Sequence, residues 1–202
     1  MPRLVDPEQR RAELVDATAA EIARVGLERL TLRGVARAGG CTTGTVSHYF
    51  VDKRALLIAT FRSRADAARA RIEEARAAGA SGLEAIVTAA LPLDEDQLAG
   101  WKVFLAFWGA AVGDDELTAI HIERHESFAS AVEDALRVEQ EAGRVSDGID
   151  VAHEAQRLVT LIDGLALQAV LQPDRWPPPT LRRMIDEHLS QLDQPGAGRI
   201  RA

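Results

Sequence analysis

Cys41 is the only cysteine among the 202 residues, so no disulfide can form within the chain. Long apolar runs are also missing. The longest, Leu158 to Leu171, contains Asp163 and Gln168 and is shorter than the roughly 20 residues that span a bilayer. The N-terminus lacks the charged start, apolar middle and small-residue cleavage site of a secretory signal. These absences exclude a disulfide scaffold and predict a cytoplasmic protein without a membrane span.

Asparagine is absent, and only two of the 24 basic residues, Lys53 and Lys102, are lysine. The net charge of -7 at pH 7 argues at first against nucleic-acid binding, which requires basic side chains to neutralise phosphates. The charge is, however, unevenly distributed. Residues 1–80 hold 14 basic against 10 acidic side chains, whereas residues 81–202 hold 10 against 21. The first 80 residues are therefore net positive, and only the remainder is acidic.

Apolar residues recur at spacings of three and four along almost the whole chain, and no alternating pattern is long enough to predict a sheet. We therefore predict an all-α protein of about nine helices separated by glycines and prolines. Thr31, Thr42 and Asp52 are expected to cap three of them, because a side-chain oxygen there accepts a backbone N–H of the first turn. The expected helices are residues 8–25, 32–38, 43–50, 53–78, 83–91, 96–112, 116–142, 151–171 and 180–192.

Two short helices joined by Gly39 and Gly40 form a candidate helix-turn-helix. The surrounding segment from Thr31 to Leu57 reads TLRGVARAGGCTTGTVSHYFVDKRALL. It resembles the signature of the TetR family of transcriptional regulators, T-x-x-x-I-A-x-x-A-G-V-S-x-G-x-x-Y-x-Y-F-x-x-K-x-x-L, and is most similar to the branch of choline-responsive BetI-type repressors. Three positions depart from the usual residues without removing the motif: Gly39 for Ala, Cys41 for Val and Ser47 for Tyr.

The resemblance implies a three-helix DNA-binding domain over residues 8–54, followed by a linking helix over residues 53–78. A ligand-binding and dimerisation domain would cover residues 79–194, where WKVFLAFWGAA, DDELTAIHIERH and LVTLIDGLALQAVL look like the same branch. It further implies a homodimeric repressor whose affinity for a pseudo-palindromic double-stranded DNA operator is lowered by a small-molecule effector.

Two other functions stay open on the sequence alone. An activator or an effector-independent regulator would carry the same DNA-binding motif. An enzyme is a remote alternative, because the chain has no glycine-rich phosphate loop, no nucleophile arrangement and no metal cluster in its sequence pattern. No cofactor is expected.

Base reading is limited by the residue types present. Without asparagine, and with no glutamine between Gln9 and Gln97, the bidentate amide contact to adenine is unavailable. Arg33, or else Arg37, is therefore expected to read guanine, whereas Arg10 or Arg11 would contact phosphates. Thr31 and Thr42 are equally well explained as helix caps alone. The expected DNA contacts are Thr31, Arg33, Thr42, Thr43, Gly44, Thr45, Ser47, His48, Tyr49 and Lys53.

Trp101, Phe104, Phe107 and Trp108 fall within eight positions of one predicted helix. Such a stripe is usually core packing, but it would also suit an effector pocket between helices. In an acidic domain, a cation held over aromatic faces is the hypothesis that follows. His121 and His125 have the spacing of a metal pair, but no glutamate directly follows the first histidine, so no metal site is expected.

The last two predicted helices are apolar over more of their surface than one covering layer requires. The family resemblance implies that they pair with their copies in a second subunit to form a four-helix interface, and an ordinary monomeric core is the alternative. The expected interface residues are Leu158, Leu161, Ile162, Leu165, Ala169, Leu181, Met184, Ile185 and Leu189.

Overall fold

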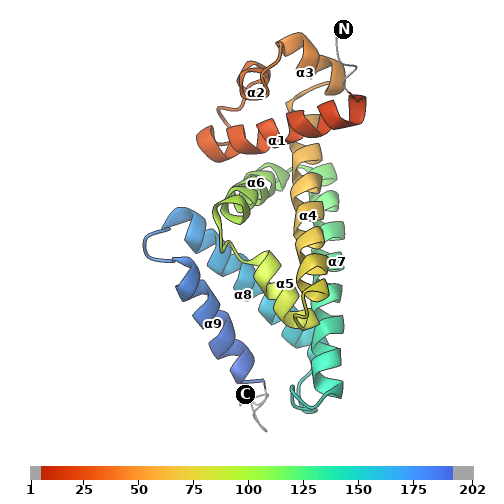
Figure 1. Cartoon of the computed structure of the whole chain (residues 1–202), viewed down its shortest axis with the longest axis vertical. Coiled ribbons are helices and arrows are strands. Elements are labelled where there is room, and N and C mark those ends of the chain that lie inside the picture. The colour runs from red at the N-terminus through yellow and green to blue at the C-terminus, as the bar shows by residue number, and fades with distance from the viewer. Residues whose placement is uncertain (1–5, 193–202) are drawn as a thin grey trace. The chain divides into compact units, whose positions relative to one another are not determined.

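The computed structural model describes residues 6–192, which form nine α-helices and no strand (Figure 1). The all-α prediction is therefore confirmed. In residues 6–192 no helix is both long enough and apolar enough to cross a membrane. The helices are α1 (Pro7–Val25), α2 (Leu32–Ala38), α3 (Thr43–Tyr49), α4 (Lys53–Ala77), α5 (Gly82–Ala90), α6 (Glu95–Ala111), α7 (Asp115–Glu141), α8 (Val151–Leu171) and α9 (Pro178–Ser190).

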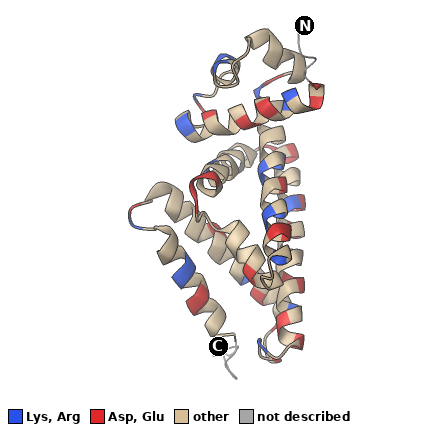
Figure 2. Cartoon of the chain, in the orientation of Figure 1, with Lys and Arg blue, Asp and Glu red and all other residues tan. Residues whose placement is uncertain are grey.

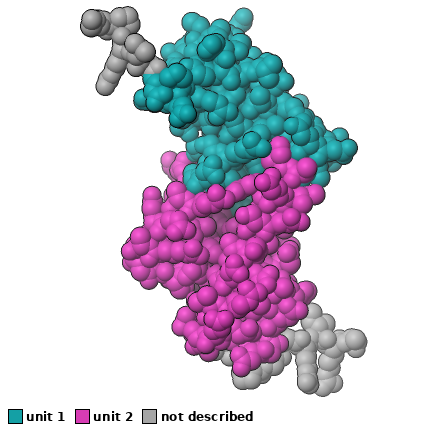
Figure 3. Space-filling model, turned by 90° about the vertical axis from the view of Figure 1, so that its right-hand side faces the viewer, with its two compact units in different colours: residues 1–67, 99–118 teal, residues 68–98, 119–202 magenta. Residues whose placement is uncertain are grey.

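The chain forms two compact units, which Figure 3 colours separately. The first unit comprises the residues up to 67 together with residues 99–118, and the second comprises residues 68–98 together with those from 119 onward. Three helices, α4, α6 and α7, begin in one unit and end in the other. The predicted DNA-binding segment, residues 8–54, lies within the first unit, and the predicted boundary at residue 79 falls inside the second. The domain limits predicted along the chain therefore stay a prediction.

Side-chain oxygens begin the helices of the first unit. The three predicted caps are present, and each accepts the backbone N–H three residues ahead: Thr31 at 3.0 Å, Thr42 at 3.1 Å and Asp52 at 2.7 Å. Each cap satisfies an N–H that has no partner inside its own helix. At the other end of α1, Gly26 has a φ of +77°, which glycine adopts without strain. Local sequence chemistry thus fixes where these helices begin and where α1 ends.

The start of α9 differs from its prediction. We predicted residues 180–192, because the proline cluster before them was interpreted as a breaker, but α9 begins at Pro178. Pro178 and Pro179 occupy its first turn, where an N–H would have no acceptor in the helix, so the missing donor costs nothing there. Proline breaks a helix from its interior, not from its first turn.

The first three helices pack around a small apolar core, with α2 lying across α1 and α3 following it (Figure 1). Each contributes a fully buried side chain: Leu14 from α1, Val35 from α2 and Val46 from α3. Leu56 from the first turns of α4 is also fully buried. The two short helices therefore depend on their longer neighbours for stability, since helices of seven residues are not stable alone.

A buried carboxylate controls how closely α1 and α2 approach each other. The Glu21 carboxylate is 6% exposed and accepts two hydrogen bonds from Arg24, at 2.8 and 2.9 Å. These bonds hold the pKa of Glu21 below its ordinary value. A Cβ built on Gly34 of α2 would lie 2.6 Å from one of its oxygens, so glycine is the residue that fits there.

The second unit has its own apolar core. Fully buried side chains come from four helices: Ile86 of α5, Leu136 of α7, Leu158 of α8 and Leu181 of α9. A polar contact also ties α9 to α8, because the Nε2 atom of His188 lies 2.6 Å from the Glu154 carboxylate. The second unit thus combines apolar packing with at least one buried polar contact.

We predict that Gly34→Ala destabilises the protein by about 1–3 kcal/mol, because the added methyl group meets a carboxylate held by two hydrogen bonds. Gly44→Ala is the matched control, since its Cβ would lie an ordinary 3.6 Å from the Thr42 hydroxyl. Thermal unfolding followed by circular dichroism measures both. Equal melting temperatures for the two variants would show that the Glu21 side chain moves aside at little cost.

Candidate functional site: nucleic-acid interface and effector region

The helix α3 presents a polar outer face and hides its apolar side. Val46 is fully buried, and the half-buried Tyr49 packs edge-on against His48, with ring centroids 5.1 Å apart. Thr45 is also half-buried, and its hydroxyl lies 3.0 Å from that of Thr42. The exposed positions of the predicted set on α3 and its cap are Thr42, Thr43, Gly44, Ser47 and His48. Hydroxyls and an imidazole on one face are groups that bond either to base edges or to phosphate oxygens.

The segment that carries α2 and α3 is free of negative charge. From Arg29 to Val51 the sequence contains no acidic residue, and Figure 2 shows both helices without one. Arg33 is exposed and makes no hydrogen bond or ion pair with any residue from 6 to 192. Arg37 differs, because its guanidinium lies 3.8 Å from the Glu21 carboxylate. The structure thus leaves Arg33 more available for a base than Arg37.

The other expected phosphate contacts have partners inside the protein. The Lys53 ammonium donates a hydrogen bond to the Leu27 carbonyl, which ties the start of α4 to the turn after α1. Arg10 forms an ion pair with Glu13 at 2.6 Å. These groups keep further N–H donors, but their side chains are positioned by the fold, so a change at either also affects packing.

Arg11 and Arg29 complete the basic side chains around the motif. The Arg11 guanidinium lies 4.9 Å from the centroid of the Phe50 ring, over its face. Arg29 is exposed and has no partner among the residues that the structure describes. The sequence analysis missed Arg29 as a candidate contact, and its only signal was its place two residues before the cap Thr31.

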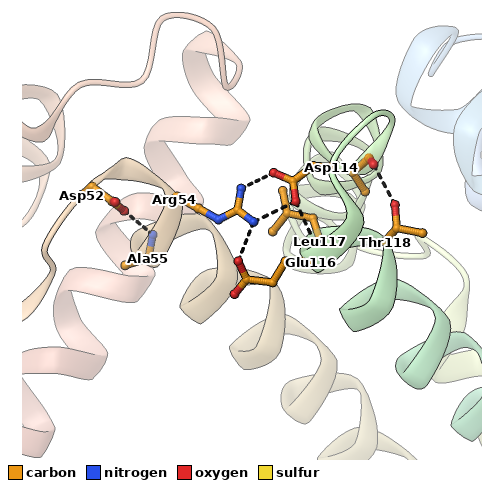
Figure 4. Close-up of polar contacts among 8 residues, drawn as sticks. Asp52, Arg54, Ala55, Asp114, Glu116, Leu117 and Thr118 are labelled. Atoms are coloured by element: carbon orange, nitrogen blue, oxygen red, sulfur yellow. Dashed lines mark hydrogen bonds and ion pairs between the residues drawn. The ribbon is translucent and has the colours of Figure 1, made fainter.

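Arg54, the neighbour of Lys53, makes an interaction that the sequence analysis did not predict (Figure 4). One guanidinium nitrogen donates to Asp114 at 2.8 Å and also to Glu116 at 2.8 Å, and the other donates to the second Asp114 oxygen. Asp114 accepts the backbone N–H of Leu117 as well, at 3.1 Å, and so caps α7. The hydrogen bonds from Arg54 and then from Leu117 hold the pKa of Asp114 well below its usual range. Arg54 therefore joins the first turn of α4 to the corner between α6 and α7.

The aromatic side chains of α6 form one cluster in the first unit. Phe107 is fully buried and stacks on Phe61 of α4, with centroids 3.9 Å apart. Trp101 is 7% exposed and packs edge-on against Phe104 at 5.5 Å and Trp108 at 5.7 Å. Phe104 and Trp108 are only half-buried. Part of the stripe is thus core packing, and the rest retains surface that a ligand can touch.

His121 and His125 lie side by side on α7, with ring centroids 5.6 Å apart. Burial, and to a lesser degree the neighbouring His125, lowers the pKa of His121. Within residues 6–192, no three or more histidine, cysteine, aspartate or glutamate side chains are grouped so as to hold a metal ion.

Most of the residues predicted for a dimer interface are already buried within one chain. Leu158, Ile162, Leu165, Ala169, Leu181 and Ile185 are at most 3% exposed. Leu161, Met184 and Leu189 are half-buried. A second subunit would therefore add little burial at the first six positions.

An open groove of about 980 Å³ follows one side of α8 within the second unit. Its wall includes Thr160, Leu161, Gly164 and Gln168 of α8, with Trp176 from the turn before α9. The indole Nε1 atom of Trp176 is buried and has no hydrogen-bond acceptor among the described residues. The groove thus combines apolar walls with an unused donor.

The tight helix pair with an acid-free, hydroxyl-bearing face defines a helix-turn-helix DNA-binding protein. The chain belongs to the TetR family: residues 14–60 match "Bacterial regulatory proteins, tetR family", and residues 79–194 match "BetI-type transcriptional repressor, C-terminal". It is a TetR-type transcriptional regulator with a BetI-type C-terminal domain, and not an enzyme.

Several known proteins are similar over most of their length. The transcriptional regulator BetI of Paraburkholderia xenovorans is 35% identical over 178 residues, covering 85% of this chain and 87% of its own. The regulator PksA of Bacillus subtilis is 26% identical, covering 95% and 94%. Among solved structures, a transcriptional regulator from Rhodococcus sp. Rha1 is 26% identical with a TM-score of 0.79, covering 92% and 98%. A regulator from Saccharomonospora viridis, solved in complex with choline, shares the fold with a TM-score of 0.81 at 20% identity, covering 90% and 96%.

We predict different DNA-binding defects for Arg33→Ala and Lys53→Ala. Arg33→Ala should cost about 1–3 kcal/mol and relax the preference at one base pair, because a bidentate guanine contact is lost. Lys53→Ala should weaken binding to all sequences evenly and lower the salt dependence by about one ion. Fluorescence anisotropy with single-base operator variants at several salt concentrations measures both effects.

The control for this pair is Arg62→Ala, which removes an exposed positive charge from α4 outside the motif. Melting temperatures are measured for all three variants, because Lys53 also binds the Leu27 carbonyl. A uniform loss across operator variants for Arg33→Ala would contradict its role as a base reader.

Proposed function

We propose that the protein is a homodimeric repressor that binds a pseudo-palindromic operator and releases it when a small cationic effector binds. The observation that carries the DNA-binding part is the exposed face of α3 on a segment without acidic residues. Phosphates would be met by the hydroxyls of Thr31, Thr42 and Tyr49 and by Lys53, and bases by Arg33 with the hydroxyls and His48 of α3. Residues 8–54 would read DNA, and residues 79–194 would bind the effector and dimerise.

The dimer follows from operator symmetry and from the groove along α8. Two copies of α3 would enter successive major grooves about 34 Å apart, which requires two subunits held in fixed register. The groove offers apolar walls, and the buried indole N–H of Trp176 lacks an acceptor. A second copy of α8 and α9 packed into this groove would cover the apolar walls and supply an acceptor. Such a use of the groove supports a symmetric interface in which the same surface serves both subunits.

The effector is proposed from two observations. Phe104 and Trp108 keep accessible aromatic surface within a tightly packed cluster, and a ring face attracts an organic cation. The similar regulator from Saccharomonospora viridis was solved with choline, a quaternary ammonium alcohol. For this chain, choline is therefore the first probe of the effector class.

The contacts of Arg54 offer a route by which such binding would reach α3. The aromatic cluster lies on α6, whose last residue, Ala111, accepts a hydrogen bond from the Thr118 hydroxyl at 2.8 Å. Asp114 in the same corner holds Arg54 in the first turn of α4. An effector that favours a different placement of α6 would favour a different placement of α4, and it lowers operator affinity by the difference between its affinities for the two states.

The proposed function is tested with a DNA fragment containing the palindrome upstream of the gene. Fluorescence anisotropy should show saturable binding that needs both half-sites and an even number of chains per operator, and choline should reverse it. The neutral isostere 3,3-dimethylbutan-1-ol is the control for charge. Equal binding to a scrambled fragment would contradict the DNA-binding part, and equal release by the neutral isostere would contradict a cationic effector.

We predict that Gly164→Arg converts the dimer into a monomer without unfolding the chain. Gly164 is exposed on the groove wall, and a Cβ there meets no atom within 4 Å, so a larger side chain obstructs only a partner. Light scattering after size exclusion measures the mass, and operator affinity should fall with it. Gly109→Arg, at an exposed helical glycine of α6 with equal space, is the matched control. A dimeric Gly164→Arg protein would exclude the groove as the interface.

A further inference from the structure

Buried carboxylates in this protein are normally paired with an arginine close by in sequence. Glu21 pairs with Arg24, Glu154 with Arg157, and Glu139 with Arg144. Such pairing is expected, because an ionised carboxylate removed from water costs several kcal/mol unless a charge and hydrogen bonds compensate for it. The three pairs set the standard by which another buried acid of the second unit departs from the rest.

Asp163 lacks such a partner. It lies in the middle of α8, and the residues one turn before and after it on the same helical face, Val159 and Ala166, are fully buried. It is the only charged residue from Leu158 to Leu171, so α8 itself offers no compensating charge. No hydrogen bond or ion pair joins its carboxylate to any residue from 6 to 192. Burial raises the pKa of Asp163 to about 7.

An unpaired carboxylate on an apolar helix face is unfavourable for folding. An asparagine, a leucine or an alanine at this position would avoid the cost of removing a charge from water. The other buried acids show that this chain places an arginine nearby when the charge has only a structural role. The missing partner is therefore a cation from outside the chain.

We propose that Asp163 is the residue that binds the cationic group of the effector, an organic monocation of the quaternary ammonium class. This inference rests on the proposed function and adds the residue that recognises the charge. One carboxylate matches one positive charge, and the apolar neighbours favour an ion with an alkyl surface over a strongly hydrated metal ion. The absence of a group of three or more metal-binding side chains within residues 6–192 agrees with an organic ion.

Isothermal titration calorimetry of the full-length dimer tests the proposal, with choline and tetramethylammonium as the cations and 3,3-dimethylbutan-1-ol as the neutral isostere of choline. Asp163→Asn keeps the size of the side chain and removes its charge. It should lower the affinity for both cations about 10- to 100-fold, the effect of losing a charged partner, and leave the neutral isostere unaffected. Asp174→Asn, at an exposed aspartate between α8 and α9, is the control and should bind the cations as the unchanged protein does.

A second measurement separates ligand binding from a structural role. At pH 8, the native carboxylate is ionised at a cost to the folded state, so Asp163→Asn should raise the melting temperature of the free protein. A lower melting temperature would show that Asp163 has a stabilising partner and would overturn the proposal.

The binding results separate this proposal from the proposed function. If the unchanged protein prefers choline to its neutral isostere and Asp163→Asn keeps that preference, the assignment of Asp163 is wrong and the cationic effector stands. If the unchanged protein binds neither cation, or binds the neutral isostere equally well, the cationic effector fails and this assignment fails with it.

Discussion

The ion pair between Arg54 and Asp114 is the contact on which the organisation of the first unit depends. Arg54 stands in the first turn of α4, four residues after Phe50 ends α3, and Asp114 caps α7 through the N–H of Leu117. One guanidinium therefore holds the helix that follows the recognition helix, and one carboxylate holds the corner where α6 turns into α7. Under the proposed function, this contact links the effector to DNA affinity, because any shift of α6 acts directly on the start of α4.

The distribution of acidic residues follows the same division of tasks. The segment from Arg29 to Val51 has none, so nothing on α2 or α3 repels a phosphate. Elsewhere, buried acids are neutralised locally, as Glu21 is by Arg24 and Glu154 is by Arg157. Asp163 breaks this rule in a helix that otherwise carries no charge beyond Arg157. The net charge of -7 thus conceals a positive DNA-reading segment and an acidic remainder suited to a cationic ligand.

Features that depend on a few consecutive residues were predictable. The caps at Thr31, Thr42 and Asp52 and the end of α1 at Gly26 follow from local hydrogen bonding and backbone freedom. The start of α9 was predicted wrongly, because the same prolines break a helix in its interior and begin one in its first turn. Contacts across 60 residues, such as that of Arg54 with Asp114, leave no mark in the local pattern.

By itself, the sequence determined the helical architecture, the helix-turn-helix and the membership of a family of regulators, because periodicity, capping and motif spacing are local properties. It also determined which bases this protein cannot read with an amide, since the residue types are absent. Only the tertiary structure decided which arginine keeps its guanidinium free, which aromatic rings stay accessible and which carboxylate has no partner. Those properties depend on what the fold brings together around each side chain, and an exposed arginine and a paired one look the same in the sequence.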